Sequence, residues 1–205
     1  MSRRHGLACI AVYTVPMNNL PINWNASYAN KKDYLPSSTP VIELLVASVS
    51  ENAPKKHLDI GCGTGQLVRE IYHRGYETTG IDTSVEAIEI ANRSSVFTGE
   101  ALRFINTDVH SFVQNNPTDN SFGLVTCKYV IAFIEDVPEF LRHVAQVLHK
   151  EGTFYIISPD LAALSAEKIS IAVDHQATMT LLEKHFAVTS QLLGRDWHYI
   201  CRPAR

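Results

Sequence analysis

The chain has 205 residues, 45% of them hydrophobic and 19% charged, and its formal net charge is −3 at pH 7. This size and composition predict one globular domain with a sizeable core. The small negative charge excludes a general electrostatic preference for nucleic acid or acidic membranes, and no apolar stretch is long enough to span a bilayer.

The N-terminal part of the chain has no regular pattern. Its first residues, MSRRHGLACIAVYTVPM, combine a basic start with an apolar run, but no A-x-A-like cleavage site follows, so a secretory signal is not expected. Met17 is an alternative start. We assign residues 1–37 to an N-terminal segment that is partly flexible, and residues 38–205 to the domain, which opens with a predicted helix over residues 38–50.

Strand-like and helix-like segments alternate from residue 55 onward. Strands are predicted at residues 55–60, 76–82, 101–108, 121–130, 153–159, 187–194 and 197–203. Helices are predicted at residues 65–75, after residue 83, from 136 to 152 and at 176–186. Thr83 and Glu86 match a T-x-x-E capping box for the second of these helices. Asp136 is expected to cap the third, and Gly152 to end it.

This alternation predicts an α/β fold of three layers, with a doubly wound, mostly parallel seven-stranded sheet. No helix separates the last two strands, so the last strand is expected to be antiparallel. In such Rossmann-like folds ligands bind beyond the carboxyl ends of the strands. The four cysteines are widely separated and form no C-x-x-C pair. They therefore predict no metal site and indicate a reducing compartment, the cytoplasm.

The stretch HLDIGCGTGQL, residues 57–67, places three glycines between the first strand and the first helix. Glycines at this point allow the backbone to approach a ligand closely. A dinucleotide fingerprint G-x-G-x-x-G would need glycine at position 66. That residue is Gln66 and the third glycine is Gly65, so binding of NAD is disfavoured.

LDIGCGTG closely resembles the first motif of the class I S-adenosylmethionine-dependent methyltransferases. Further matches follow in order: GID ending at Asp82, 23 residues after Asp59; NTDVHSF around Asp108; and the stretch FGLVTCKYVIAFIEDVPEFLRHVAQVLHKEGTFYIISP. The resemblance implies transfer of the sulfonium methyl group to an O, N or S nucleophile of a small molecule. S-adenosyl-L-homocysteine would be the product.

The resemblance also implies a role for each matched residue. Asp59 would accept from the ammonium group of the cofactor, Asp82 from both ribose hydroxyls and Asp108 from the adenine amino group, beside the Val109 amide. The expected cofactor-binding residues are Asp59, Gly61, Cys62, Gly63, Gly65, Asp82, Thr83, Asp108, Val109 and Lys128. Five structural alternatives stay open: a purely structural turn at Asp59 and the glycines, a helix-charge role for Asp82, a turn or cap at Asp108, a solvated Lys128 and a packing role for Cys62.

The residue that acts on the acceptor is not evident from sequence. Phe133 stands where the family's V-L-x-H-V/I-x-D segment has histidine, no N/D-P-P-Y/F/W motif follows the fourth strand, and no carboxylate cluster suggests magnesium. Tyr28, His110 and Tyr129 are the candidate catalytic residues. We hypothesise that Tyr28 and Tyr34 close the site. Further candidates at its mouth are Trp24, Asp160, His175 and His198.

Alternatives to a small-molecule methyltransferase are an RNA or protein methyltransferase and a non-catalytic module that binds the cofactor. The absence of a basic stripe argues against RNA. We expect no nucleic-acid or membrane partner, and a monomer or homodimer.

Overall fold

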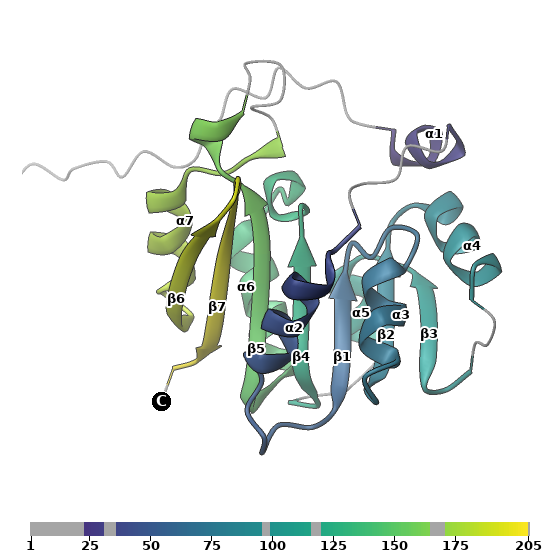
Figure 1. The fold of residues 1–205 in the computed structure, drawn as a ribbon, viewed down its shortest axis with the longest axis horizontal. Helices are drawn as coiled ribbons and strands as arrows, with labels where there is room; N and C mark the ends of the chain where they lie inside the picture. Colours follow the sequence, from purple (N-terminus) through teal and green to yellow (C-terminus); the bar gives the residue numbers. More distant parts are fainter. Residues whose placement is uncertain (1–22, 31–35, 96–98, 116–119, 165–170, 205) are drawn as a thin grey trace, which may run out of the picture.

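The computed structural model describes residues 23–30, 36–95, 99–115, 120–164 and 171–204. Its centre is a seven-stranded sheet (Figure 1). The strands are β1 Lys56–Ile60, β2 Glu77–Asp82, β3 Leu102–Asn106, β4 Phe122–Lys128, β5 Leu148–Pro159, β6 Phe186–Leu193 and β7 Asp196–Pro203. The helices are α1 Trp24–Ala29, α2 Thr39–Ala47, α3 Gln66–Tyr72, α4 Val85–Arg93, α5 Val109–Asn115, α6 Val137–Val147 and α7 His175–Leu182. Two short 3-10 helices are η1 Ile131–Phe133 and η2 Leu161–Ala163.

The strand order is β3-β2-β1-β4-β5-β7-β6. The pairs among β1 to β5 are parallel, whereas β7 is antiparallel to both β5 and β6. A turn at Gly194, with φ of 66°, joins β6 to β7. The predicted α/β fold with an antiparallel last strand is therefore confirmed. The order reverses between β1 and β4, which is where doubly wound sheets bind ligands.

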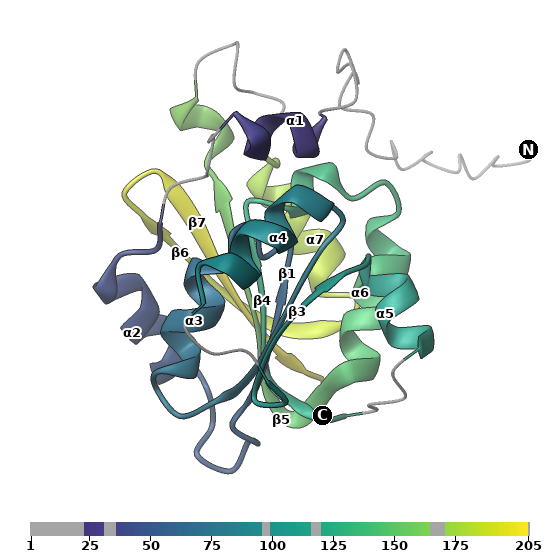
Figure 2. The same ribbon diagram turned by 90° about the vertical axis from the view of Figure 1, so that its right-hand side faces the viewer.

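Helices cover both faces of the sheet (Figure 2). On one face, Leu45 of α2 and Ile71 of α3 share a cluster with Tyr155 of β5. On the other face, Phe112 of α5 belongs to the larger cluster that includes Phe154 of β5. No helix in the described part of the chain has the length and apolar character to cross a membrane. The three layers follow from strands that are buried on both sides.

The expected capping box at Thr83 and Glu86 is wrong by one residue. Ser84 is the N-cap of α4, and its hydroxyl oxygen accepts from the Ala87 amide at 3.2 Å. The Ser84 amide is itself held at 2.8 Å by a carboxylate oxygen of Asp82. Asp82 therefore sets where the helix begins, and Thr83 remains exposed.

The expected end of the third helix at Gly152 is also wrong. α6 begins after its predicted cap, Asp136, but it ends at Val147, and Leu148 already pairs with Phe122 of β4. A Cβ atom on Gly152 would lie 2.9 Å from the Phe122 carbonyl oxygen. The register of β4 and β5 shifts between Phe122 and Leu124. Gly152 therefore permits close backbone contact at this irregular strand pairing.

Candidate active site

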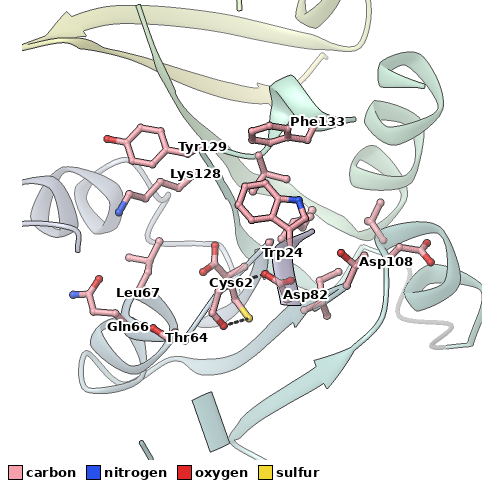
Figure 3. A pocket seen from close by; sticks show the side chains of 18 of the residues that line it. Trp24, Cys62, Thr64, Gln66, Leu67, Asp82, Asp108, Lys128, Tyr129 and Phe133 are labelled. Atoms are coloured by element: carbon pink, nitrogen blue, oxygen red, sulfur yellow. Dashed lines mark hydrogen bonds between the residues drawn. The ribbon is translucent and has the colours of Figure 1, made fainter. Parts of the chain in front are cut away.

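A cavity of about 530 Å³ lies at the carboxyl ends of β1, β2, β3 and β4 (Figure 3). It sits at the point where the strand order reverses. Of the ten predicted cofactor-binding residues, nine line it: Asp59, Gly61, Cys62, Gly63, Asp82, Thr83, Asp108, Val109 and Lys128. The tenth, Gly65, is not part of the wall. The structure thus brings together residues from four separate strand ends.

The glycine turn has a packing reason beyond access for a ligand. Gly61, Gly63 and Gly65 have φ of 72°, 53° and 79°, a region that costs other residues strain. A Cβ atom on Gly65 would overlap the ring of Phe104, and one on Gly61 would overlap Val130. The room that these glycines leave is therefore partly filled by the chain's own side chains. Gly65 serves the start of α3 rather than the cavity.

Asp82 joins the glycine turn to α4. Its two carboxylate oxygens accept from the Gly63 amide at 2.9 Å and from the Ser84 amide at 2.8 Å. Burial raises the pKa of Asp82, and the N–H groups of Ser84, Gly63 and Thr83 counter that shift. A carboxylate oxygen can accept more than one hydrogen bond, so both remain able to accept from a ligand in the cavity.

Asp59 is the last member of a buried chain of hydrogen-bonded side chains, here called the His57–Thr126–Asp59 relay. The sequence analysis did not predict it. The Thr126 hydroxyl donates to a carboxylate oxygen of Asp59 at 2.6 Å, and Nε2 of His57 lies 2.8 Å from the same hydroxyl oxygen. Burial lowers the pKa of His57 to about 3, so the imidazole is neutral. Because the Thr126 hydrogen is given to Asp59, His57 must donate from Nε2. The one available signal was polar residues inside otherwise apolar strands.

The Asp59 carboxyl group titrates near neutrality. Its side chain is 3% exposed, and burial raises its pKa to about 7. The Thr126 hydrogen bond and the charge of Lys128 oppose this shift, whereas the charge of Asp82 adds to it. A cation bound beside Asp59 would favour the ionised form.

Asp108 forms the cap that was one of the alternatives for it. Its carboxylate oxygens accept from the Ser111 amide at 2.9 Å and from the Ser111 hydroxyl at 2.8 Å. This pattern holds the first turn of α5. The residue is exposed and still contributes to the cavity wall. Its side chain can therefore serve both the helix and a ligand.

Lys128 and Tyr129 border the cavity at the end of β4 (Figure 3). Tyr129 has φ of 58°, and its hydroxyl donates to Oδ2 of Asp196 at 2.8 Å. Lys128 Nζ lies 5.2 Å from the centre of the Tyr129 ring. Burial, then the hydrogen bond and charge of Asp196, raise the pKa of Tyr129 well above its usual value. The phenol is thus held protonated, which suits positioning better than proton abstraction.

Helix α1 lies beyond the carboxyl ends of the parallel strands (Figure 1). The Ser84 hydroxyl donates to Oδ1 of Asn25 at 2.7 Å, which ties α1 to the start of α4. The rings of Trp24 and Phe133 meet edge to face, with centroids 5.0 Å apart. Tyr28 is 7% exposed. Trp24, Tyr28 and Phe133 all line the cavity.

A second contact from the N-terminal segment uses Gln66, a residue of the cavity wall that the sequence analysis did not predict. The Ser37 amide donates to Oε1 of Gln66 at 3.0 Å, and Nε2 of Gln66 donates to the Ser37 carbonyl at 3.4 Å. Arg69, also in the cavity wall, donates to the Thr64 carbonyl at 2.8 Å. One signal for this position was visible in the sequence: Gln66 stands where the dinucleotide fingerprint G-x-G-x-x-G has its third glycine.

Several predicted residues do not join the cavity wall: His110, Asp160, His175 and His198. The His175 ring stacks on Trp197 with centroids 3.6 Å apart, and Nδ1 of His198 lies 3.0 Å from the Tyr155 hydroxyl. His110 faces α6. Tyr34 and residues 1–22 lie outside the described residues.

Three solved structures share the fold of this chain at low identity. A methyltransferase in complex with the Trm112 activator of Haloferax volcanii has a TM-score of 0.70 at 15% identity, covering 91% of this chain and 100% of that one. A 1,6-didemethyltoxoflavin-N1-methyltransferase from Burkholderia thailandensis, solved with that compound and S-adenosylhomocysteine, has 0.65 at 19%, covering 88% and 85%. A SAM-dependent methyltransferase from Aquifex aeolicus has 0.64 at 14%, covering 78% and 88%.

Sequence comparison identifies the family. A ubiquinone biosynthesis O-methyltransferase from Yersinia enterocolitica is 31% identical over 98 residues, which are 48% of this chain and 40% of that protein. The chain thus spans less than half the length of this curated relative. A family model described as a methyltransferase domain matches residues 51–204, well over half of the chain. The chain belongs to the family of class I S-adenosylmethionine-dependent methyltransferase domains.

Proposed function

We propose that this protein transfers the sulfonium methyl group of S-adenosylmethionine to an O, N or S nucleophile of a small molecule. One observation carries the proposal: three carboxylates, from the ends of β1, β2 and β3, and a glycine turn share one cavity wall. These carboxylates belong to Asp59, Asp82 and Asp108. Each comes from a different strand, so a ligand that spans all three must be extended, as an adenosine joined to a methionine is.

The wall has groups that match such a ligand. Asp59 is a buried carboxyl group with a raised pKa, and an ammonium group beside it would add to the charge of Lys128 in favouring the ionised form. Asp82 retains acceptor capacity on both oxygens for a pair of hydroxyls. Asp108 is exposed at the wall and can accept from an exocyclic amine. We assign these three residues to the methionine ammonium group, the ribose and the adenine, respectively.

Catalysis in this site would rest on orientation. When bound, S-adenosylmethionine supplies a methyl group on positively charged sulfur, which a nucleophile removes by in-line displacement. Lys128 and Tyr129, both in the cavity wall, would border the acceptor, and Trp24 with Phe133 would shield it from water. Alignment of reactants can supply about 7–11 kcal/mol of the barrier.

The chain's own groups favour an acceptor that needs little help from a base. No histidine is among the described residues of the cavity wall, and the Tyr129 phenol is held protonated by burial and by Asp196. An amine, a thiolate or an acidic phenol therefore fits better than an alcohol. The names of the Yersinia and Burkholderia relatives refer to small molecules, which supports a small acceptor.

Isothermal titration of the full chain with S-adenosylhomocysteine and with NAD tests the proposal. We expect binding of the former and none of the latter, and a loss of at least about tenfold for Asp82→Asn. Glu86→Gln is the matched control, since Glu86 is a carboxylate in the first turn of α4, close to Asp82 in the chain, but does not line the wall. Equal losses in both variants would assign Asp82 to helix electrostatics and contradict the proposed site.

Release of S-adenosylhomocysteine with panels of small molecules, RNA and protein then separates the alternatives. Turnover with a small molecule supports the proposal. Turnover only with RNA or protein, or binding without any turnover, would assign the chain to one of the other two functions.

A further inference from the structure

We propose that His110, Glu139 and His143 form a binding site for a divalent transition-metal ion such as Zn²⁺. The three residues meet between α5 and α6, outside the cavity wall. Two imidazole nitrogens and a carboxylate are a donor set that suits zinc. The sequence predicted no metal site, because His110 and the α6 pair are far apart along the chain.

The spacing of the donor atoms is close to what a metal ion requires. Nδ1 of His110 lies 3.2 Å from Nε2 of His143, and Oε1 of Glu139 lies 3.4 Å from the same nitrogen. Tetrahedral zinc with bonds of about 2.0–2.1 Å has ligand atoms about 3.3–3.4 Å apart. All candidate ligand atoms lie within 4.8 Å of one another. Rotation of the Glu139 side chain therefore brings its carboxylate oxygen to the distance from Nδ1 of His110 that a shared metal ion requires.

The scaffold holds the two histidines in place. Glu139 and His143 are four residues apart on α6 and so share one face of the helix. His143 is 3% exposed, which restricts its ring. The amide of Gln114 lies 2.8 Å from Nε2 of His110. With its oxygen turned to that atom, Gln114 would fix the tautomer of His110 that leaves Nδ1 free for a metal.

Arg142 is the group that competes with a metal ion. Its guanidinium pairs with the Glu139 carboxylate and lies 3.1 Å from Nε2 of His143. The Arg142 side chain is 57% exposed, so it can swing into solvent when an ion enters. Its positive charge opposes the ion, and its removal should therefore tighten metal binding.

Calorimetric titration of the full chain with ZnCl₂, together with absorption spectra in Co²⁺, tests the site. We expect one ion per chain and tetrahedral Co²⁺ bands. His110→Ala and Glu139→Gln should each weaken binding at least about tenfold, whereas Arg142→Gln should strengthen it. His110 and Arg142 are both exposed, so these variants should fold even where His143→Ala does not.

His149→Ala is the matched control, because His149 lies outside the cluster and contacts only the nearby Glu151 amide in the described hydrogen bonds. It should bind zinc as the unmodified chain does. Failure of the unmodified chain to bind Zn²⁺ would overturn the proposal. So would unchanged affinity in His110→Ala and Glu139→Gln, or a cobalt–thiolate absorption band, which would assign the ion to cysteine.

Discussion

The two halves of the cavity were assembled in different ways. The wall at the ends of β1, β2 and β3 consists of residues that directly follow a strand, so a short motif places each of them. The wall at the end of β4 depends on a contact between distant residues: Tyr129, which lines the cavity, donates to Asp196 at the start of β7, 67 positions away. Local motifs therefore locate the wall that we propose binds the cofactor, here called the cofactor half. Long-range packing shapes the wall at Lys128 and Tyr129, beside the proposed acceptor, here called the acceptor half.

The largest expected effect concerns the glycine turn that follows β1, beside the cofactor half. Gly65→Ala should lower the free energy of unfolding by about 2–5 kcal/mol, because strain at φ of 79° adds to overlap with Phe104. Gly75→Ala is the matched control: its φ is 83°, but no atom lies within 4 Å of the added Cβ. Its free energy of unfolding, measured by urea denaturation, should be lower by about 1–2 kcal/mol. Equal losses would show that packing against Phe104 is not a constraint.

The second effect concerns the pH dependence of stability. The folded-state pKa of Asp59, about 7, lies above its ordinary value of 3.8. The native state therefore holds a proton that the unfolded state has lost, and stability falls as pH rises from 4 to 7. Asp59→Asn should remove this penalty and be more stable than the unmodified chain by up to about 4 kcal/mol at pH 8, with no difference below pH 4.

Urea denaturation of both proteins across this range measures the effect. Stability curves that run parallel from pH 4 to pH 8 would show that the carboxyl group ionises normally. His57→Asn should move the pH range over which the free energy of unfolding falls, because His57 orients the Thr126 hydroxyl that donates to Asp59.

A third effect tests whether the contact between Tyr129 and Asp196 shapes the acceptor half. Tyr129→Phe removes the donor to Asp196. It should lower the free energy of unfolding by about 1.5–3 kcal/mol, because the hydrogen bond is made to a charged group. The affinity for S-adenosylhomocysteine should change less than about twofold, because the cofactor half is intact. A double-mutant cycle with Asp196→Asn measures the coupling. A coupling near zero would mean that this long-range pair does not shape the wall.

The smallest effect concerns the α1 cover. Asn25→Ala removes the acceptor of the Ser84 hydroxyl and should cost about 1 kcal/mol. Amide exchange in α1 should become faster, and S-adenosylhomocysteine should dissociate faster. Asn30→Ala is the matched control, because Asn30 bonds only within α1 in the described contacts. Unchanged exchange in Asn25→Ala would show that other contacts hold the helix.

Element boundaries were wrong where a hydrogen bond or a strand pairing overrode the expected pattern. Asp82 held the Ser84 amide, so α4 began one residue later than the capping pattern indicated. Pairing with Phe122 drew Leu148 into β5, although the helical pattern continued past it. The short helix α5 was not predicted, because its seven residues carry too little periodic signal.

The sequence alone determined the seven strands, all described α-helices except α1 and α5, the antiparallel end of the sheet and the acidic residues that line the cavity. These features depend on patterns within a few residues, because side-chain periodicity and helix caps are set by the local backbone conformation. Only the tertiary structure decided the His57–Thr126–Asp59 relay, the contact of Tyr129 with Asp196 and the meeting of His110 with α6. Each of these joins elements that are neighbours only after the sheet has formed, and no local pattern encodes such proximity.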